Sequence, residues 1–324
     1  MKIIKKPKDT NNFIATVAIG EKHLKEWQQY ILPSWMLYCE RNGLGLVVFE
    51  NELIDKSHSK WKKANWHKLL MGDKLKELNA NNVCYLDTDI LISPLAPNVF
   101  NFHEDEKISV VSQTKTPFEH SKVLRKVAFL RNRYLSSDYP LDSALFMPRE
   151  DFYKYHNFAP QEDFFCSGFF IFNVNNFGRI LEEWFFKYPS NVETITNAGE
   201  EPILNYEFQN YGEIKWLDYK FQAIWAYEMA EKYPFLYQDI NNKEIVKKCI
   251  QTSLQQNYFL HFAGRWEGDV YKDESIINAN FLAELQDFDG YLQSPVTGKP
   301  VGPIYPNCCV LRDTYARYHN KKNN

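Results

Sequence analysis

The sequence lacks any apolar run of the roughly 18–20 residues that a membrane-spanning helix requires. Its basic N-terminus, MKIIKKPKDTNN, is not followed by the apolar stretch of a secretory signal peptide. The formal net charge is only −3, so the chain has no general affinity for nucleic acid or anionic lipid. These absences predict a cytoplasmic protein that would bind a polyanion only through a local site.

The sequence also lacks the cysteine spacing of a zinc site and the cluster of glycines of a phosphate-binding loop. The six cysteines are scattered, and none of their spacings matches a zinc site. Cys84 and Cys166 lie in apolar runs and are predicted to be small core residues in a reducing compartment. Only Gly20 stands where a nucleotidyltransferase would need a glycine-rich phosphate loop, so that class is disfavoured.

Apolar and aromatic residues, in contrast, are abundant. The chain is 44% hydrophobic and contains 8 Trp, 20 Tyr and 24 Phe, which is enough for a packed core and excludes disorder. Apolar, β-rich segments alternate with helical ones through the first half of the chain, at 11–20, 44–49, 83–86, 107–112 and 169–174. This alternation predicts an α/β fold with a mostly parallel central sheet flanked by helices.

The C-terminal part differs in composition. Residues 266–324 contain Pro295, Pro300, Pro303 and Pro306 and end in a polar tail. We therefore expect a catalytic domain over residues 1–265 and a C-terminal extension, 266–324, packed on it. Within the domain, we expect helices over 21–43, restarting at Pro33, and over 61–78.

Two aspartates follow the buried strand predicted at 83–86. Asp87 and Asp89 are separated by one residue, so in an extended segment their side chains point to the same side. Ligands bind at the carboxyl ends of parallel strands, and two such carboxylates suit a hard divalent cation. A turn or a helix N-cap is the alternative, and the same triplet recurs at Asp287 and Asp289, which we interpret as a turn.

A phosphatase of the haloacid dehalogenase type would also place two aspartates after an apolar strand. That pattern calls for Thr or Val two residues after the second aspartate, where this chain has Leu91. It also needs a later Gly-Asp loop after a strand, and MGDK (71–74) and EGDV (267–270) follow none. This alternative remains open.

Six stretches together resemble GT-A-fold glycosyltransferases, which use nucleotide sugars. They are FIATVAIG, WKKANWHKLL, VCYLDTDILI, DFFCSGFFIFNV, GEEPILNYEF and YFLHFAGR, in the order expected for that family, and they span about residues 12–265. The resemblance is closest to retaining enzymes of the glycogenin and lipopolysaccharide galactosyltransferase type (family 8-like). The pair Glu200-Glu201, where those enzymes usually have Asp-Gln, is a blood-group-type feature.

The resemblance implies a role for each matched position. The nucleoside would lie against Thr16, Val17 and Ala18, and Lys68 would be the basic residue directed at the donor. Ser167 and Gly168 would line the donor sugar, where the departure from Asn-Ala-Gly leaves Asp163 to bind a sugar hydroxyl. Glu200 or Glu201 would lie beneath the anomeric carbon and attack it or stabilise positive charge there. The helix that both glutamates open would favour acidic residues for dipole reasons alone.

The last matched stretch supplies a third ligand. A neutral imidazole is a good ligand for manganese, so Asp87, Asp89 and His261 form the predicted site for Mn²⁺ or Mg²⁺. A histidine at a strand end can equally be a satisfied core residue. Gly264 would let the backbone approach a phosphate, and Arg265 would pair with diphosphate oxygens or lie on the surface.

The sequence thus predicts a metal-dependent hexosyltransferase that acts with retention. It would move a hexose from a nucleoside-diphosphate sugar, a UDP-sugar by resemblance, to a glycan, lipid-linked or protein acceptor. The alternatives are the phosphatase and a non-catalytic nucleotide- or carbohydrate-binding protein on the same fold. Basic residues within 115–142 predict an amphipathic helix whose cationic face is solvated or contacts an anionic acceptor or membrane surface.

Overall fold

The computed structural model of the chain describes residues 1–8, 10–135, 144–192, 199–264 and 269–285. A seven-stranded sheet with the strand order β1-β3-β2-β4-β7-β6-β8 lies at its centre. These strands are β1 (Lys2–Lys5), β2 (Phe13–Val17), β3 (Gly45–Phe49), β4 (Asn82–Leu86), β6 (Ile108–Val111), β7 (Phe169–Asn173) and β8 (Ile214–Leu217). Only β1 and β7 run against the other five. The predicted α/β fold class with a mostly parallel sheet is confirmed.

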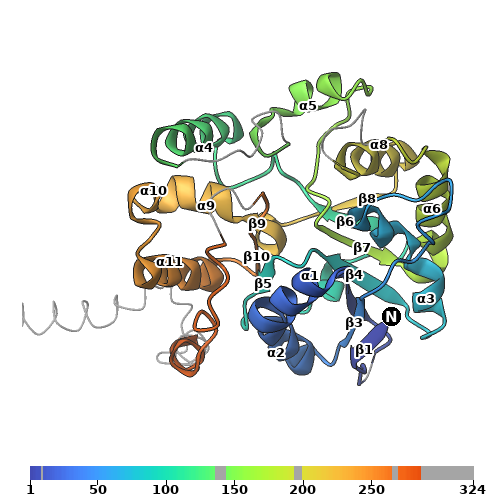
Figure 1. Cartoon of the computed structure of the whole chain (residues 1–324), viewed down its shortest axis with the longest axis horizontal. Coiled ribbons are helices and arrows are strands. Elements are labelled where there is room, and N and C mark those ends of the chain that lie inside the picture. The colour runs from blue at the N-terminus through green and yellow to red at the C-terminus, as the bar shows by residue number, and fades with distance from the viewer. Residues whose placement is uncertain (9, 136–143, 193–198, 265–268, 286–324) are drawn as a thin grey trace, which may run out of the picture. The chain divides into compact units, whose positions relative to one another are not determined.

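Helices cover both faces of this sheet, which explains why its central strands read as continuous apolar runs. Every residue of β3 and of β7 is buried. One face of β2 and β4 packs into a core with side chains from η2, α3, α6 and α8: η2 (Ala64–Leu70), α3 (Gly72–Lys76), α6 (Val174–Lys187) and α8 (Glu201–Tyr211). Figure 1 shows α3 and α6 side by side next to the sheet.

The segment 21–43 behaves as its sequence predicts. It forms α1 (Glu21–Glu26), a π-helical turn η1 (Trp27–Ile31) and α2 (Leu32–Asn42). Pro33 lies in the first turn of α2, where its missing N–H costs nothing. Gly43 ends α2 with φ 65°, in the left-handed region that favours glycine.

The segment 61–78 departs from the predicted helix. It forms a 3₁₀ helix, η2, followed by the short α3. Four consecutive side chains of η2, Trp66 to Leu69, are buried, and four consecutive residues of an α-helix cannot all lie on one buried face. The strand β1, which pairs with the outer side of β3, was not predicted at all.

A second, three-stranded sheet brings distant parts of the chain together. Its order is β5-β10-β9, with β5 (Ile90–Ile92), β9 (Ala223–Ile224) and β10 (Phe259–His261). The strands β5 and β10 are antiparallel, and His261 lies opposite Ile90 in the register. The end of β10 therefore reaches the turn between β4 and β5.

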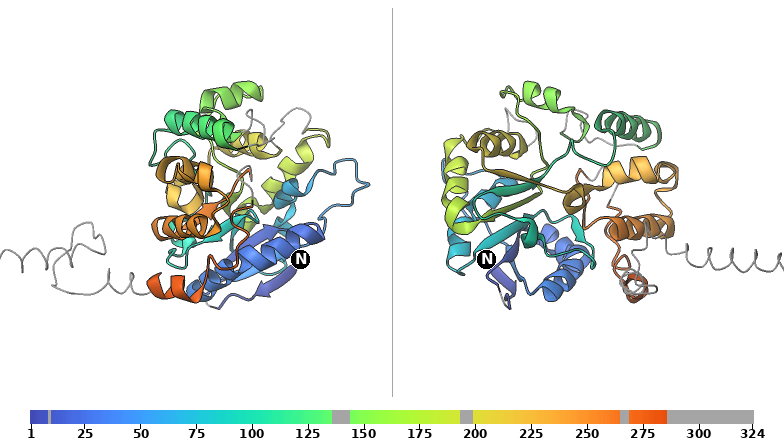
Figure 2. Two further views of the ribbon diagram at one scale, coloured as in Figure 1. Left: turned by 60° about the vertical axis from the view of Figure 1, so that its left-hand side comes forward. Right: turned by 180° about the vertical axis from the view of Figure 1, so that it is seen from behind.

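The remaining α-helices of the described residues lie between residues 120 and 256. They are α4 (His120–Tyr134), α5 (Arg149–Tyr155), α9 (Trp225–Lys232), α10 (Leu236–Asp239) and α11 (Lys243–Gln256). Figure 2 shows α4 next to α9 in both of its views. No helix among the described residues is both long and apolar enough to cross a membrane.

The chain divides into two compact units, Met1–Ile276 and Ile277–Asn324. All sites considered below belong to the first unit. The second unit is described only over residues 277–285, where Phe281 and Leu285 are buried. The expected boundary between a catalytic domain and an extension at 265/266 stays a prediction.

Candidate metal and donor site

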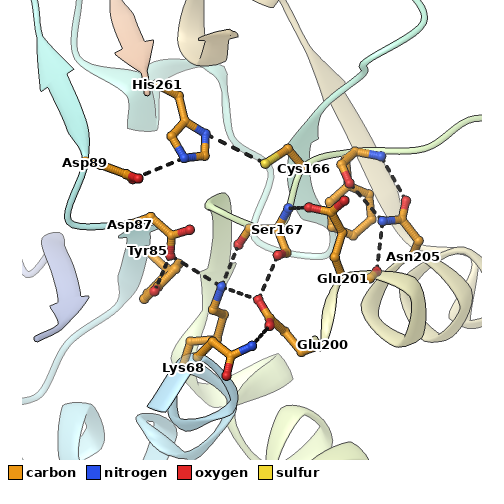
Figure 3. Close-up of polar contacts among 12 residues, drawn as sticks. Lys68, Tyr85, Asp87, Asp89, Cys166, Ser167, Glu200, Glu201, Asn205 and His261 are labelled. Carbon is orange, nitrogen blue, oxygen red and sulfur yellow. Dashed lines mark hydrogen bonds and ion pairs between the residues drawn. The ribbon is translucent and has the colours of Figure 1, made fainter. Parts of the chain in front are cut away.

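The two aspartates and the distant histidine meet at the carboxyl end of β4. Asp87 follows β4, Asp89 precedes β5, and β10 places His261 beside them, with Nε2 3.2 Å from Asp89 Oδ1. Each of the three residues offers one ligand atom, and these atoms lie within 4.8 Å of one another. Figure 3 shows the three side chains turned toward one another. The sequence prediction that they come together agrees with this geometry.

The donor set and the surrounding space both fit a divalent cation. Two carboxylates and one imidazole suit manganese or a similar ion. Gly168 borders the same space: a Cβ placed there would lie 2.5 Å from His261 Cε1 and 2.8 Å from Asp87 Oδ2. The close packing of both side chains therefore depends on a residue without a side chain at position 168.

Asp87 is held from two further sides. The Tyr85 hydroxyl donates a hydrogen bond of 2.5 Å to Asp87 Oδ1, and Lys68 Nζ lies 3.4 Å from the same oxygen. Burial alone would raise the pKa of Asp87, but the charges of Lys68 and His261 and the bond from Tyr85 lower it. Asp87 is therefore ionised and available as a ligand at neutral pH.

His261 is also fixed by its neighbours. Its Nδ1 lies 3.2 Å from Gln222 Nε2 and 3.7 Å from Cys166 Sγ. Burial would lower the pKa of His261, but the adjacent Asp89, followed by Asp87, raises it. Contacts to the second ring nitrogen commonly orient a ligating histidine, and Gln222 has that position here.

Lys68 and Glu200 form a buried ion pair next to Asp87. Lys68 Nζ lies 2.6 Å from Glu200 Oε1, and both side chains are almost fully buried, at 1% and 6% exposed. Glu200 Oε1 also accepts a 2.8 Å bond from Ser167 Oγ, and Asn65 Nδ2 donates to Glu200 Oε2. Burial would lower the pKa of Lys68, but the charges of Asp87 and Glu200 raise it, so the amine stays protonated.

Glu201 has a different environment from its neighbour. Its Oε2 accepts a 3.1 Å bond from the Ser167 backbone N–H, and it lies partly exposed at the start of α8. Burial, reinforced by the charge of Glu200, raises the pKa of Glu201 to about 7. Asn205, one turn along α8, bonds the Phe165 backbone in both directions and so ties α8 to the 163–168 segment.

Asp163 lies in a separate hydrogen-bond network. Its carboxylate accepts bonds from the hydroxyls of Ser112 (2.7 Å) and Thr114 (2.6 Å) and from the Phe164 N–H (2.8 Å). Its side chain is 1% exposed. These contacts connect the end of β6 to the segment before β7, and the predicted role of Asp163 toward a donor hydroxyl stays a prediction.

The remaining predicted site residues that the structure describes lie at the ends of β2 and β10, one strand from each sheet. Thr16 and Val17 end β2, which is parallel to β4, and the Ala18 N–H bonds the Phe49 carbonyl at 2.9 Å. Gly264 follows β10 with φ 90°, a conformation that favours glycine. Arg265 lies outside the described residues.

Sequence reasoning missed several residues that build this site. Asn65 could not have been found, because it aligns with Lys68 only in a 3₁₀ helix, which repeats every three residues and which the sequence did not predict. Tyr85 could have been found, since it lies two residues before Asp87 along an extended strand. Nothing in the local sequence pointed to Gln222, which reaches His261 only through the fold.

The predicted basic helix is α4. Its apolar residues Val123, Leu124 and Val127 are buried, whereas Lys122, Arg125 and Arg133 are exposed, and Phe129 is 66% exposed. Lys122 pairs with Glu119. The amphipathic pattern is confirmed, and a contact of this face with an anionic acceptor or a membrane stays a prediction.

Comparisons with known proteins give only distant structural likenesses. No protein-family model matches the chain, and no curated protein matches it. A glycosyltransferase involved in the glycosylation of the major capsid of PBCV-1 is 9% identical over 82% of this chain and 99% of its own, with a TM-score of 0.47. The galactosyltransferase LgtC is 14% identical over 88% and 98%, with a TM-score of 0.44.

Mouse xyloside xylosyltransferase 1 is a third such likeness. It is 10% identical over 79% of this chain and 99% of its own, with a TM-score of 0.38. These TM-scores are all below 0.5, so the function must be argued from the site of this chain itself.

Proposed function

We propose that the protein is a metal-dependent glycosyltransferase that transfers a hexose from a nucleoside-diphosphate sugar to a hydroxyl acceptor. The observation that carries this proposal is the meeting of Asp87, Asp89 and His261 next to the pair of glutamates that opens α8. A cation site and a carboxylate pair are the two elements needed to stabilise a departing diphosphate and a positively charged sugar.

The cation would be held by Asp87, Asp89 and His261, and Mn²⁺ fits their donor atoms best, with Mg²⁺ as the alternative. When bound, such an ion neutralises the charge of a diphosphate leaving group. On the protein side, Gly168 keeps the space open and Tyr85 and Lys68 orient Asp87.

The donor would lie across the carboxyl ends of the strands, as ligands of α/β sheets generally do. Thr16, Val17 and Ala18 would contact the nucleoside, which the resemblance implies is uridine. Ser167 and Gly168 would line the sugar. Gly264 and Arg265 would face the diphosphate, since a glycine lets the backbone approach it closely.

Glu201 is the better placed of the two glutamates to act on the sugar. It is partly exposed and has few contacts to its carboxylate, whereas Glu200 is paired with Lys68. Glu201 would stabilise positive charge at the anomeric carbon or attack that carbon, and transfer from the same face would then retain its configuration. The acceptor would be a glycan, a lipid-linked glycan or a protein hydroxyl.

A thermal-unfolding panel of nucleotide sugars, with and without Mn²⁺, tests this proposal. Ligands raise the melting temperature only if they bind the native state, and a ligand at 100 times its Kd contributes about 2.7 kcal/mol. We expect one nucleotide sugar to stabilise the protein strongly when Mn²⁺ is present and weakly when it is absent. Incubation of that donor with Mn²⁺ should then release the nucleoside diphosphate.

The same panel separates the alternatives. Release of inorganic phosphate from a phosphomonoester, without any nucleotide sugar, would indicate the phosphatase. Stabilisation by donor and Mn²⁺ without turnover on any acceptor or water would indicate a binding protein. Failure of every nucleotide sugar to stabilise the protein would contradict the proposal.

A further inference from the structure

We infer that Glu200 and Lys68 are a buried ion pair that positions Asp87 for the cation, and that neither acts directly on the donor. This inference rests on the proposed function and assigns separate tasks to residues that the sequence pattern treats as equivalent. Glu201 is then left as the carboxylate that faces the sugar, and the diphosphate must be met by groups other than Lys68.

The contacts of Lys68 leave it no hydrogen-bond donor for a substrate. A lysine ammonium has three protons. Lys68 Nζ has three acceptors, at 2.6 Å (Glu200 Oε1), 3.1 Å (Ser167 O) and 3.4 Å (Asp87 Oδ1). It also lies 4.7 Å from the centroid of the Tyr85 ring. Figure 3 shows Lys68 enclosed between Asp87, Ser167 and Glu200.

Glu200 is likewise engaged through both carboxylate oxygens. Oε1 accepts from Lys68 and Ser167, and Oε2 accepts from Asn65. The residue is 4% exposed. A carboxylate that must attack a sugar or approach an oxocarbenium-like centre needs a free face, whereas three of the roughly four acceptor positions of Glu200 are already used. Glu201, one residue further on, accepts from the Ser167 N–H and is less buried.

The backbone is built around this ion pair. Asn65 and Lys68 lie one 3₁₀ turn apart in η2, so both side chains project toward Glu200 from the same side. Gly199 precedes Glu200 with φ 66°, and a Cβ there would lie 2.5 Å from Asn65 Nδ2. Only glycine therefore lets Glu200 come within reach of Asn65 and Lys68.

The pairing matters for the cation because Lys68 also contacts a proposed ligand. With Glu200 ionised, the ammonium has a closer carboxylate than Asp87. Without that charge, Asp87 would be the nearest carboxylate to Lys68, and the ammonium would compete with a cation for it. Glu200 thus acts as a positioning residue, since it keeps Lys68 from neutralising Asp87.

The affinity of the protein for Mn²⁺ alone, followed by the electron paramagnetic resonance signal of free Mn²⁺, tests this assignment without turnover. We expect Glu200→Gln to weaken Mn²⁺ binding by about tenfold, the usual effect of removing a group that orients a ligand. Glu201→Gln is the matched control, because it makes the same chemical change one residue away. It should leave Mn²⁺ affinity within about twofold while abolishing transfer.

Unfolding of the metal-free protein in urea provides a second, independent measurement. Lys68→Met leaves the buried charge of Glu200 without its ammonium partner and removes a positive charge from beside Asp87, so its urea midpoint should fall clearly below that of the wild type. Adding Glu200→Gln to that variant removes the unpaired charge of Glu200 and should bring the midpoint back toward the wild type. Such non-additivity is the signature of a directly interacting pair.

Two results would overturn the inference. Unchanged Mn²⁺ affinity in Glu200→Gln, together with lost transfer, would make Glu200 a catalytic residue. If the effects of Lys68→Met and Glu200→Gln on unfolding are additive, the two residues do not interact directly and the inferred ion pair is contradicted. If the wild type binds neither Mn²⁺ nor any donor, the proposed function fails. Urea unfolding of the single and double variants would still show whether Lys68 and Glu200 form an ion pair.

Discussion

Two carboxylate sites in this protein are satisfied in different ways. Asp163 accepts hydrogen bonds from two hydroxyls and an N–H, of Ser112, Thr114 and Phe164. One lysine, Lys115, also places its Nζ 3.5 Å from Asp163 Oδ2. At the end of β4, in contrast, Asp87 and Asp89 face His261, Lys68 and a further pair of glutamates. Asp163 is a single carboxylate with three neutral donors and one lysine, whereas the end of β4 gathers four carboxylates around one lysine and one histidine.

The difference indicates what each site is for. Hydrogen bonds from fixed neutral donors satisfy a buried carboxylate and connect the elements that carry them. Carboxylates gathered in excess over their cationic partners repel one another, which costs stability unless a cation joins them. The excess of negative charge at the β4 edge is therefore the physical argument for a functional site there.

The largest effect that tests this comparison is expected from Asp89→Asn. The substitution keeps the shape of the side chain but removes one ligand charge, so Mn²⁺ binding and metal-dependent transfer should fall by at least 10²-fold. Binding is measured by Mn²⁺ titration and transfer by release of the nucleoside diphosphate. Circular dichroism should show an unchanged fold, and full activity in this variant would remove the metal role of Asp89.

The matched change in the other site is Asp163→Asn. An amide cannot accept all three of the hydrogen bonds from Ser112, Thr114 and Phe164, so the free energy of unfolding should fall by about 1–3 kcal/mol, measured in urea. Mn²⁺ affinity should not change. If instead transfer is lost while stability is kept, Asp163 contacts the donor, as the resemblance implies, and the contrast between the two sites fails.

A smaller effect is expected in the pH dependence of stability. The pKa of Glu201 is raised to about 7 in the folded protein, above its usual value. Its favourable contribution is therefore fully present below about pH 4.5 and is lost as the pH rises through about 7. Urea unfolding of the metal-free protein at pH 5 and pH 8 should lose on the order of 1–3 kcal/mol from this group.

Glu201→Gln is the variant that isolates this contribution. It cannot ionise, so its stability should change less between the two pH values than that of the wild type. An equal change in both proteins would show that Glu201 does not titrate in this range. That result would weaken the distinction between Glu201 and Glu200, which is paired with Lys68.

Much of the fold could be predicted from the sequence because its signals are local. The strands at 83–86 and 169–174 are apolar runs of strand length, and both form central strands of the sheet. Pro33 and Gly43 mark a helix restart and a helix end by their own backbone preferences. The edge strand β1, with lysines at both ends, carries no such apolar signal and was missed.

The site could be predicted from the sequence only where the residues adjacent in the chain indicate the position of a site residue. Asp87 and Asp89 follow a strand, so their position could be inferred, and resemblance added His261. The contacts of Lys68 could not be anticipated, because they depend on η2 forming a 3₁₀ helix and on Gly199 approaching Asn65. Tertiary packing outweighed the helical pattern of that segment. As a result, Lys68 contacts Glu200, whereas it was expected to be directed at the donor.

The pairing of β10 with β5 has a consequence for how the molecule is made. A ribosome releases the N-terminal residues first, and early parts of a chain can fold before later ones emerge. The strands β2 and β4 are synthesised long before residue 261, whereas β5, which follows Asp89, pairs with β10 and so depends on that later part of the chain. A nascent chain would therefore carry both aspartates before β10 can pair with β5, and the three ligands could come together only after residue 261 has emerged.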